Sequence, residues 1–203
     1  MIKNIVFDFG QVLVHFEPEY MVGKYVTDPC DAKLLENVVF DRLYWDRLDA
    51  GTITDEETVK LVKERLPERL WDVAEKIYYN WIYNIPEIDG MRELIVYLKE
   101  NYKISVFLTS NISKYFVAHR DEIPMLKLLD NCIFSSTCGY VKPDVKIFEH
   151  LINECGIKPD ETLFVDDRRE NVEGASMIGI LGYIFDGNAE KLKIYIDTLM
   201  KNS

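Results

Sequence analysis

Long hydrophobic runs are absent from this sequence of 203 residues. Its apolar stretches, such as residues 5–9 and 104–108, are far shorter than the roughly 20 residues that a membrane-spanning helix needs. Residues 1–4 lead directly into the first apolar run and leave no room for the charged and apolar regions of a secretory signal. We therefore expect a soluble, cytoplasmic protein with no membrane partner.

Cysteine and positive charge are also scarce. The four cysteines show neither a C-x-x-C pair nor the spacing of a zinc site, so we expect free thiols (Cys30, Cys132, Cys138 and Cys155). With 24 basic and 35 acidic residues, the formal net charge is -11. This charge opposes binding to nucleic acids and anionic membranes, so an anionic ligand would need local positive charge from a side chain or a metal ion.

The order of apolar segments predicts an α/β protein. From residue 86 onward, short apolar runs alternate with stretches of helical periodicity, which favours a parallel sheet with helices on both faces. Residues 16–85 show helical periodicity alone, and Thr54 with Glu57 forms a capping-box pattern within them. We expect a core made of residues 1–15 and 86–203, with an all-helical insertion of residues 16–85 after the first strand.

Polar residues stand at the ends of several apolar runs. Asp8 follows residues 5–7, Ser110 follows 106–108, and the pair Asp166-Asp167 follows 163–165, while Lys142 precedes a proline in a separate loop. The carboxyl edge of a parallel sheet is where open α/β proteins bind ligands. Each motif alone has an ordinary structural alternative, such as a turn or a helix N-cap. Together they predict a site at this edge.

The four motifs, in this order, resemble those of the haloacid dehalogenase (HAD) superfamily, and the resemblance extends from residue 4 to about 185. It implies a Rossmann-like core with the helical insertion as a cap domain, and residues 48–53 resemble a turn seen in such caps. The D-F-G-Q-V-L opening and the aspartate pair are most similar to sugar-phosphate phosphatases of the glucose-1-phosphatase type.

The resemblance assigns catalytic and substrate-binding roles. A carboxylate that attacks phosphorus divides hydrolysis into two steps through an aspartyl-phosphate, and Asp8 is the expected nucleophile. Lys142 would place positive charge on the transferred phosphoryl group, and Ser110 would donate its hydroxyl to a phosphoryl oxygen, with Asn111 beside it. Ser110, Asn111 and Lys142 are therefore the predicted substrate-binding residues.

The resemblance also implies a magnesium site. Mg²⁺ prefers oxygen ligands and usually takes one or two carboxylates from the protein. Asp8, the Gly10 carbonyl and Asp167 are the expected direct ligands, with Asp166 and Asn171 in support through water or hydrogen bonds. Adjacent carboxylates at a strand end repel each other unless a cation or hydrogen-bond donors are near, which also favours a metal.

One position departs from the superfamily pattern. Most phosphatases of this superfamily carry a second aspartate two residues after the nucleophile, as general acid and base, and Gly10 occupies that position here. The proton could come from water, from a phosphate oxygen, or from a side chain such as His15 or Glu17.

We therefore predict a Mg²⁺-dependent phosphatase acting on a small phosphorylated metabolite, with a sugar phosphate expected, as a monomer or weak homo-oligomer. Two alternatives remain open at this point. One is a metal-free haloacid dehalogenase, and the other is a catalytically silent relative that binds a phosphorylated ligand or a protein.

Overall fold

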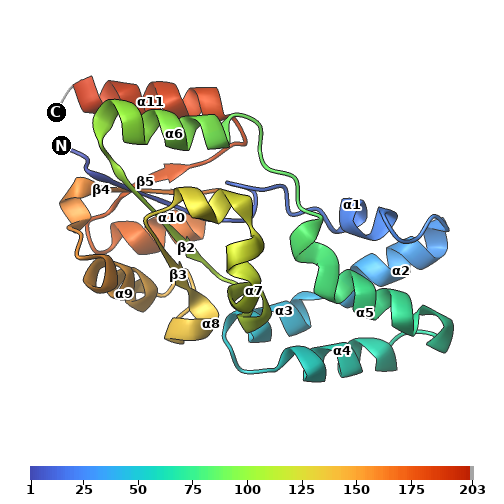
Figure 1. Ribbon diagram of the computed structural model, residues 1–203. Helices are drawn as coiled ribbons and strands as arrows, with labels where there is room; N and C mark the ends of the chain where they lie inside the picture. Colours follow the sequence, from blue (N-terminus) through green and yellow to red (C-terminus); the bar gives the residue numbers. More distant parts are fainter. Residues whose placement is uncertain (202–203) are drawn as a thin grey trace.

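A computed structural model describes residues 1–201. Its centre is a five-stranded parallel sheet with the order β3-β2-β1-β4-β5 (Figure 1). The strands are β1 (Asn4–Phe7), β2 (Ser105–Ser110), β3 (Asn131–Phe134), β4 (Thr162–Asp166) and β5 (Leu181–Ile184). The strand that carries Asp8 is thus the middle one, and the predicted α/β fold with a parallel sheet is confirmed.

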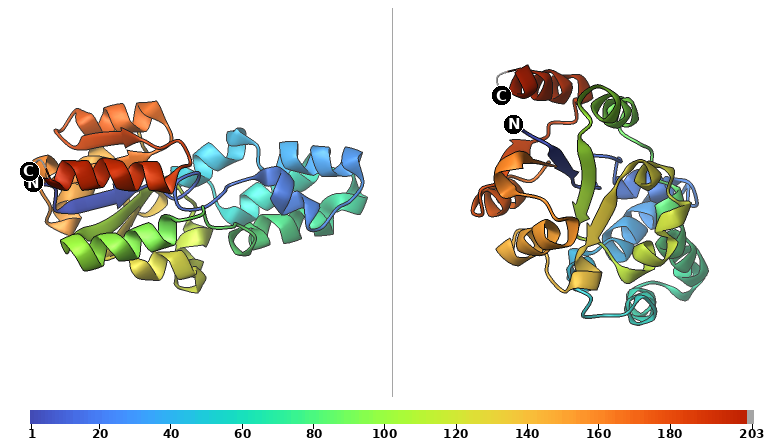
Figure 2. Two further views of the ribbon diagram at one scale, coloured as in Figure 1. Left: turned by 90° about the horizontal axis from the view of Figure 1, so that it is seen from above. Right: turned by 60° about the vertical axis from the view of Figure 1, so that its left-hand side comes forward.

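Two layers of helices cover the sheet. Helices α6 (Met91–Tyr102) and α11 (Ala189–Lys201) lie side by side on one face, and α9 (Val145–Cys155) and α10 (Arg169–Ser176) lie on the other (Figure 2). Side chains alternate between the two faces along a strand, so both faces of β1 must be apolar to be buried. Accordingly, Ile5 and Phe7 pack with α6 and α11, whereas Val6 packs with α9 and α10.

The helical insertion, residues 16–85, lies beyond the carboxyl ends of the strands (Figures 1 and 2). It has an apolar core of its own. Thr54 and Glu57 form the expected capping box at the start of α4. Its α-helices are α1 (Pro18–Gly23), α2 (Pro29–Val39), α3 (Arg42–Asp49), α4 (Asp55–Glu64) and α5 (Trp71–Asn80). The assignment of these residues to a separate cap domain stays a prediction.

Two neighbouring segments connect the insertion to the sheet. The His15 N–H donates to the Pro86 carbonyl at 2.8 Å, and the Ile88 N–H donates to the Leu13 carbonyl at 3.0 Å. An aromatic cluster lies beside this double connection, with ring centroids 5.4 to 5.9 Å apart in most pairs (Phe16, Phe40, Trp45 and Trp81). The two connecting segments are therefore joined to each other by two backbone hydrogen bonds, and Trp45 and Trp81 of the insertion pack into the same apolar cluster as the sheet.

Some expected helices are shorter in the structure. The periodicity of residues 113–129 predicts helical segments, and the structure has α7 (Lys114–His119) followed by 3₁₀ turns at Arg120–Glu122 and Pro124–Leu128. Pro124 lacks a backbone N–H and favours an extended residue before it, and Ile123 is extended. The apolar periodicity from about 68 to 83 predicts one helix, and the structure has α5 flanked by 3₁₀ turns at Glu68–Leu70 and Trp81–Tyr83. The sequence pattern does not predict the short helix α8 (Ser135–Cys138). A further 3₁₀ turn spans Pro159–Glu161.

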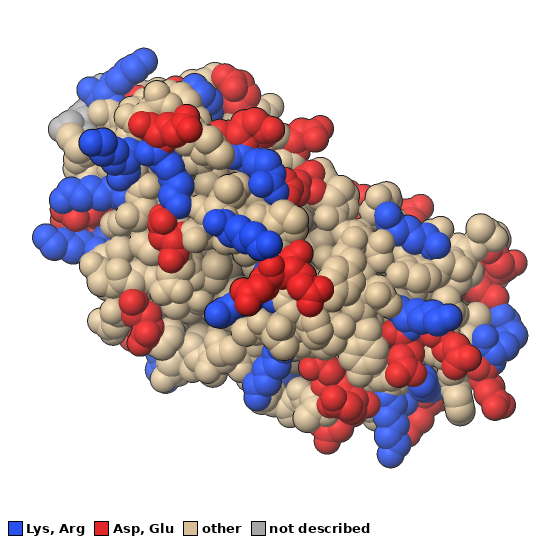
Figure 3. Space-filling model, in the orientation of Figure 1, with Lys and Arg blue, Asp and Glu red and all other residues tan. Residues whose placement is uncertain are grey.

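The surface agrees with the overall composition. On the face shown in Figure 3, Lys and Arg side chains are scattered among Asp and Glu side chains and do not gather into one patch. Among residues 1–201, no helix combines the length and the apolar character needed to cross a membrane.

Candidate active site

The predicted site residues meet at the carboxyl edge of the sheet. Asp8 follows β1, and its N–H donates to the Val165 carbonyl of β4 at 2.9 Å. Ser110 and Asp166 are the last residues of β2 and β4, the two neighbours of β1. A single cavity between the sheet and the helical insertion is lined by all the predicted site residues except Asp166 (Asp8, Gly10, Ser110, Asn111, Lys142, Asp167 and Asn171).

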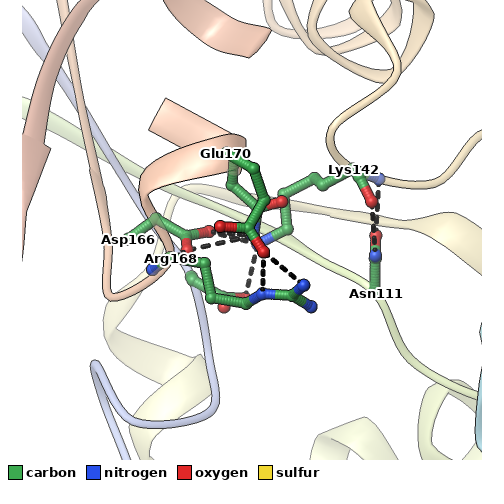
Figure 4. A network of polar contacts seen from close by, with 7 residues as sticks. Asn111, Lys142, Asp166, Arg168 and Glu170 are labelled. Carbon is green, nitrogen blue, oxygen red and sulfur yellow. Dashed lines mark hydrogen bonds and ion pairs between the residues drawn. The ribbon is translucent and has the colours of Figure 1, made fainter. Parts of the chain in front are cut away.

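Lys142 connects two of the carboxylates. Its side chain is almost fully buried, and its ammonium group lies 2.7 Å from one oxygen of Asp8 and 2.7 Å from one oxygen of Asp166. Figure 4 shows the ammonium end of the side chain directed toward Asp166. One buried positive charge thus serves two buried negative charges, which leaves the group of three with a net negative charge.

The backbone of Lys142 is fixed by Asn111. The Asn111 amide donates to the Lys142 carbonyl at 2.9 Å, and its carbonyl oxygen accepts from the Lys142 N–H at 2.8 Å (Figure 4). This pair joins the end of β2 to the loop between α8 and α9. The side chain of Asn111 therefore positions Lys142, and its amide keeps one further N–H donor.

Protein groups occupy the hydrogen-bonding positions of both carboxylate oxygens of Asp166. Besides Lys142, its carboxylate accepts from the Arg168 N–H at 2.9 Å and from the Asn171 amide, which is 3.0 Å from each oxygen. Asp166 is fully buried. It therefore holds Lys142 and the start of α10 in place.

The hydroxyl of Ser110 faces the cavity without a protein partner. The residue is buried, and within residues 1–201 its side chain forms no hydrogen bond. A hydroxyl at the end of a buried strand keeps its donor available for a ligand oxygen.

Burial shifts the ionisation of this cluster. Burial raises the pKa of Asp8 to about 6; the Lys142 ammonium opposes this rise and the negative charge of Asp166 adds to it. Burial also raises the pKa of Asp167, again with a contribution from Asp166. For Lys142, burial lowers the pKa, but the two carboxylates outweigh it and the pKa is raised above its usual value. The lysine is therefore charged, and further positive charge would stabilise the carboxylates.

The donor set fits a hard divalent cation. Oxygens of Asp8, Asp166 and Asp167 all lie within 4.8 Å of one another. Asp167 is half-buried and, within the described chain, forms no salt bridge. Asn171 donates to Asp166 and leaves its own carbonyl oxygen buried without a partner, which suits a metal-bound water. These residues are those expected of a magnesium site.

Several cavity residues were not anticipated from the sequence. The helical insertion contributes Arg42, Asp49 and the aromatic side chains of Trp45 and Trp81, and the core contributes Arg168, whose guanidinium donates to Glu170 at 2.8 Å (Figure 4). The aromatic residues belong to an apolar stripe of ordinary appearance. One sequence feature points to Asp49 as a cavity residue. It lies four residues after Trp45 on the same helical face and just before the turn at Gly51.

His15 and Glu17 do not lie on the cavity wall. Their side chains are 41% and 58% exposed, and the nearest nitrogen and oxygen of the two are 3.8 Å apart. They are therefore poorly placed to supply the proton that an aspartate at position 10 would give.

Known proteins share both the sequence pattern and the fold. Residues 2–179 match the haloacid dehalogenase-like hydrolase family. A D-ribitol-5-phosphate phosphatase of Bacteroides thetaiotaomicron is 28% identical over 88% of this chain and 89% of its own length. A sesquiterpene phosphatase of Aspergillus oryzae is 32% identical over 89% of this chain and 88% of its own length.

Among solved structures, a HAD family enzyme of B. thetaiotaomicron in complex with magnesium and inorganic phosphate superimposes with a TM-score of 0.69 at 21% identity, over 93% of this chain and 96% of that one. This likeness shows the fold. Because the family match covers most of the chain and includes the three strand-end motifs and the loop of Lys142, the protein is an enzyme of the haloacid dehalogenase-like hydrolase family.

Proposed function

We propose that this protein is a Mg²⁺-dependent phosphatase that hydrolyses a small phosphorylated metabolite, of the sugar or polyol phosphate type, through an aspartyl-phosphate on Asp8. The observation that carries the proposal is the placement of Lys142. Its ammonium group contacts Asp8 at 2.7 Å in the same cavity that exposes the free hydroxyl of Ser110. The nucleophile, the cation and the hydroxyl donor thus line the same cavity.

The residues divide the work of phosphoryl binding. Lys142 holds the Asp8 carboxylate and offers positive charge to the incoming phosphoryl oxygens, while Ser110 donates a hydrogen bond to one of them. Asp166 keeps Lys142 charged and immobile, and Asn111 fixes the backbone that carries it. These groups are positioned before the substrate arrives, so little reorganisation is needed during the reaction.

Asp8, the Gly10 carbonyl and Asp167 would hold Mg²⁺, with Asn171 and Asp166 in support. When bound, the ion supplies positive charge that offsets the repulsion between the Asp8 carboxylate and the phosphate dianion. No described backbone or side-chain donor occupies the Gly10 carbonyl, which leaves it available.

The wall opposite the phosphoryl site favours a compact leaving group. Phe16, Trp45 and Trp81 provide an aromatic surface from the insertion, and Arg42 of the same insertion adds positive charge. Aromatic faces pack well against the C–H faces of sugars and polyols. Of the two relatives, the D-ribitol-5-phosphate phosphatase of B. thetaiotaomicron has a substrate of this kind.

The test is phosphate release with and without metal. The purified protein should release inorganic phosphate from p-nitrophenyl phosphate and from ribitol 5-phosphate in the presence of Mg²⁺, and chelation should abolish both activities. Asp8→Asn should remove turnover while leaving the fold intact, because the two side chains have the same shape. Asp72→Asn changes an exposed carboxylate of α5 in the same way and should be as active as the parent.

Two other outcomes would replace the proposal. Halide release from a 2-haloacid in the presence of chelator would identify a metal-free dehalogenase. Tight binding of phosphate esters without any turnover would identify a silent binding protein.

A further inference from the structure

A third carboxyl group of the cavity, Asp49, takes no part in binding the phosphoryl group or the metal. It is the last residue of α3 and is 6% exposed, and its side chain lines the cavity that contains Asp8 and Lys142. It belongs to the wall that the helical insertion contributes, whereas Asp8 and Lys142 belong to the wall that the core contributes. The leaving group of a substrate bound to Asp8 would lie between these two walls.

The position of Asp49 is fixed by the core. The Ser135 hydroxyl donates to the Asp49 carbonyl at 2.6 Å, and the same hydroxyl accepts from the Ile112 N–H at 2.9 Å. The chain then turns at Gly51, where φ is +67° and an added Cβ would lie 3.0 Å from the Ser136 carbonyl oxygen. The backbone of Asp49 therefore rests directly on helix α8 of the core.

The carboxylate of Asp49 has no partner in the protein. Within residues 1–201 it accepts no hydrogen bond and forms no ion pair, although more than nine-tenths of the residue is buried. A buried carboxylate without donors is costly when charged, so such a group is rare unless it serves a ligand.

The groups around Asp49 do not neutralise it. Burial raises its pKa to about 7; Arg42 opposes this rise, Asp46 and Asp8 add to it, and Lys142 lowers it slightly. The remaining charged group nearby is Lys114 of α7, whose side chain lies beside Gly51. Near neutral pH, the group can therefore hold a proton and can also release it.

The reaction needs such a group because Gly10 has no side chain. The other ionisable residues of the cavity are committed: Asp8 is the nucleophile, Asp167 the metal ligand, and Lys142 the partner of Asp8 and Asp166. Arginine stays protonated at these pH values and cannot act as the acid. Within residues 1–201, Asp49 is the remaining carboxyl group on the wall of this cavity.

We propose that Asp49 is the general acid and base of this enzyme, supplied by the helical insertion in place of an aspartate at position 10. The assignment rests on the proposed phosphatase function. In the first step an oxygen of Asp8 attacks phosphorus, the bond from phosphorus to the leaving oxygen breaks with its electron pair on that oxygen, and the Asp49 proton moves to it. In the second step the Asp49 carboxylate takes a proton from water, whose oxygen attacks phosphorus. The Asp8–phosphorus bond then breaks, and inorganic phosphate and protonated Asp49 result.

The first test compares leaving groups in Asp49→Asn. An alkyl phosphate such as ribitol 5-phosphate needs a proton on its leaving oxygen, whereas p-nitrophenolate leaves without one. In the variant, kcat/KM should fall by a factor of about 10² to 10⁴ for the alkyl ester and by less than about tenfold for the aryl ester. The parent's kcat/KM for the alkyl ester should fall as the pH rises through about 7, and this limb should be absent from the variant.

The second test measures the later step. With p-nitrophenyl phosphate, Asp49→Asn should show a burst of one p-nitrophenolate per enzyme and should accumulate phosphorylated Asp8, because no base activates the water. Asp72→Asn, an exposed carboxylate of the insertion, should show neither effect.

A rescue variant separates chemistry from structure. An added Cβ at Gly10 would meet the Phe16 Cβ at 3.6 Å, an ordinary contact, and the backbone there is not left-handed, so position 10 accepts a side chain at its Cβ. Gly10→Asp in the Asp49→Asn background should raise kcat/KM for the alkyl ester at least tenfold above that of Asp49→Asn alone. A structural defect at Asp49 would not be repaired from position 10.

The outcomes distinguish the two proposals. If the parent releases phosphate from neither ester, the proposed function is wrong and the role of Asp49 falls with it. If the parent is active but Asp49→Asn loses both esters equally, keeps the pH profile or is not rescued, only the role of Asp49 is overturned.

Discussion

The Ser135 hydroxyl lies 2.6 Å from the carbonyl oxygen of Asp49, 86 residues earlier in the chain. This hydrogen bond joins helix α8 of the core to the last residue of helix α3 in the insertion. Because Ser135 also accepts from the Ile112 N–H, one buried hydroxyl connects the end of β2, the core and the cavity wall. The cavity therefore depends on a contact that is far from the catalytic groups in sequence.

Two neighbouring serines allow a direct test of this contact. Ser135→Ala should lower the free energy of unfolding by about 1 to 3 kcal/mol, because it leaves the Ile112 N–H buried and unsatisfied. Ser136 is also buried, but within residues 1–201 its hydroxyl has no partner, so Ser136→Ala should change stability by less than about 0.5 kcal/mol or stabilise slightly. Urea unfolding of both variants measures the difference, and equal losses would contradict the role of the Ser135 hydroxyl.

Lys142 is expected to be essential for both activity and the ionisation of the cluster. Lys142→Met keeps the length of the side chain but removes the charge between Asp8 and Asp166, so turnover should fall by at least about 10². Stability should fall by about 3 to 5 kcal/mol at neutral pH, because two buried carboxylates lose their common partner.

Lys146→Met is the matched control for this variant. Lys146 is exposed and its ammonium lies over the ring of Tyr140, 5.7 Å from the centroid, so its loss should leave turnover unchanged. Steady-state kinetics and thermal unfolding of the two variants give both quantities. Normal turnover in Lys142→Met would contradict the proposed arrangement of the site.

The magnesium site can be tested without catalysis. Mg²⁺ that binds the folded protein raises its melting temperature, and the rise grows with the logarithm of the Mg²⁺ concentration relative to the dissociation constant. Asp167→Asn should abolish most of this rise, because Asp167 has no salt bridge to maintain and its carboxylate is free for the ion. Asp160→Asn, at an exposed position, should keep the full rise. An undiminished shift in Asp167→Asn would mean that the ion binds elsewhere.

The sequence predicts the core and the strand-end residues because each depends on local order along the chain. Asp8, Ser110 and the aspartate pair each end an apolar run, and parallel strands place such ends at one edge. Asp49 could not be assigned in the same way, since it stands in a helix whose approach to the sheet depends on tertiary contacts such as Ser135. The pairing of Asn111 with the Lys142 backbone likewise joins segments that no local pattern relates.

The raised pKa of Asp49 has a consequence for stability. The unfolded carboxyl loses its proton near 3.8, whereas the folded one keeps it to about 7. Between these values the folded state binds more protons, so the contribution of Asp49 to stability falls as the pH rises and becomes constant above about 7. The difference corresponds to roughly 4 kcal/mol as an upper order of magnitude.

Asp49→Asn removes this cost, since asparagine stays neutral. The variant should be more stable than the parent at pH 8 by about 1 to 4 kcal/mol, and the gain should shrink toward pH 4. Urea unfolding at several pH values measures it. A gain that does not change with pH would show that Asp49 ionises normally in the folded protein.

Gly174 of α10 sets how closely that helix approaches the loop of Lys142. An added Cβ there would lie 2.4 Å from the Pro143 carbonyl oxygen, so the loop or the helix has to move. Gly174→Ala should therefore cost about 1 to 3 kcal/mol of stability despite the better helix propensity of alanine, and it should lower kcat as Lys142 shifts. Gly23→Ala is the control, because no atom lies within 4 Å of its added Cβ and alanine should there stabilise α1 by up to about 1 kcal/mol. If Gly174→Ala were as stable and active as the parent, the close approach of Gly174 to Pro143 would not limit the position of the Lys142 loop.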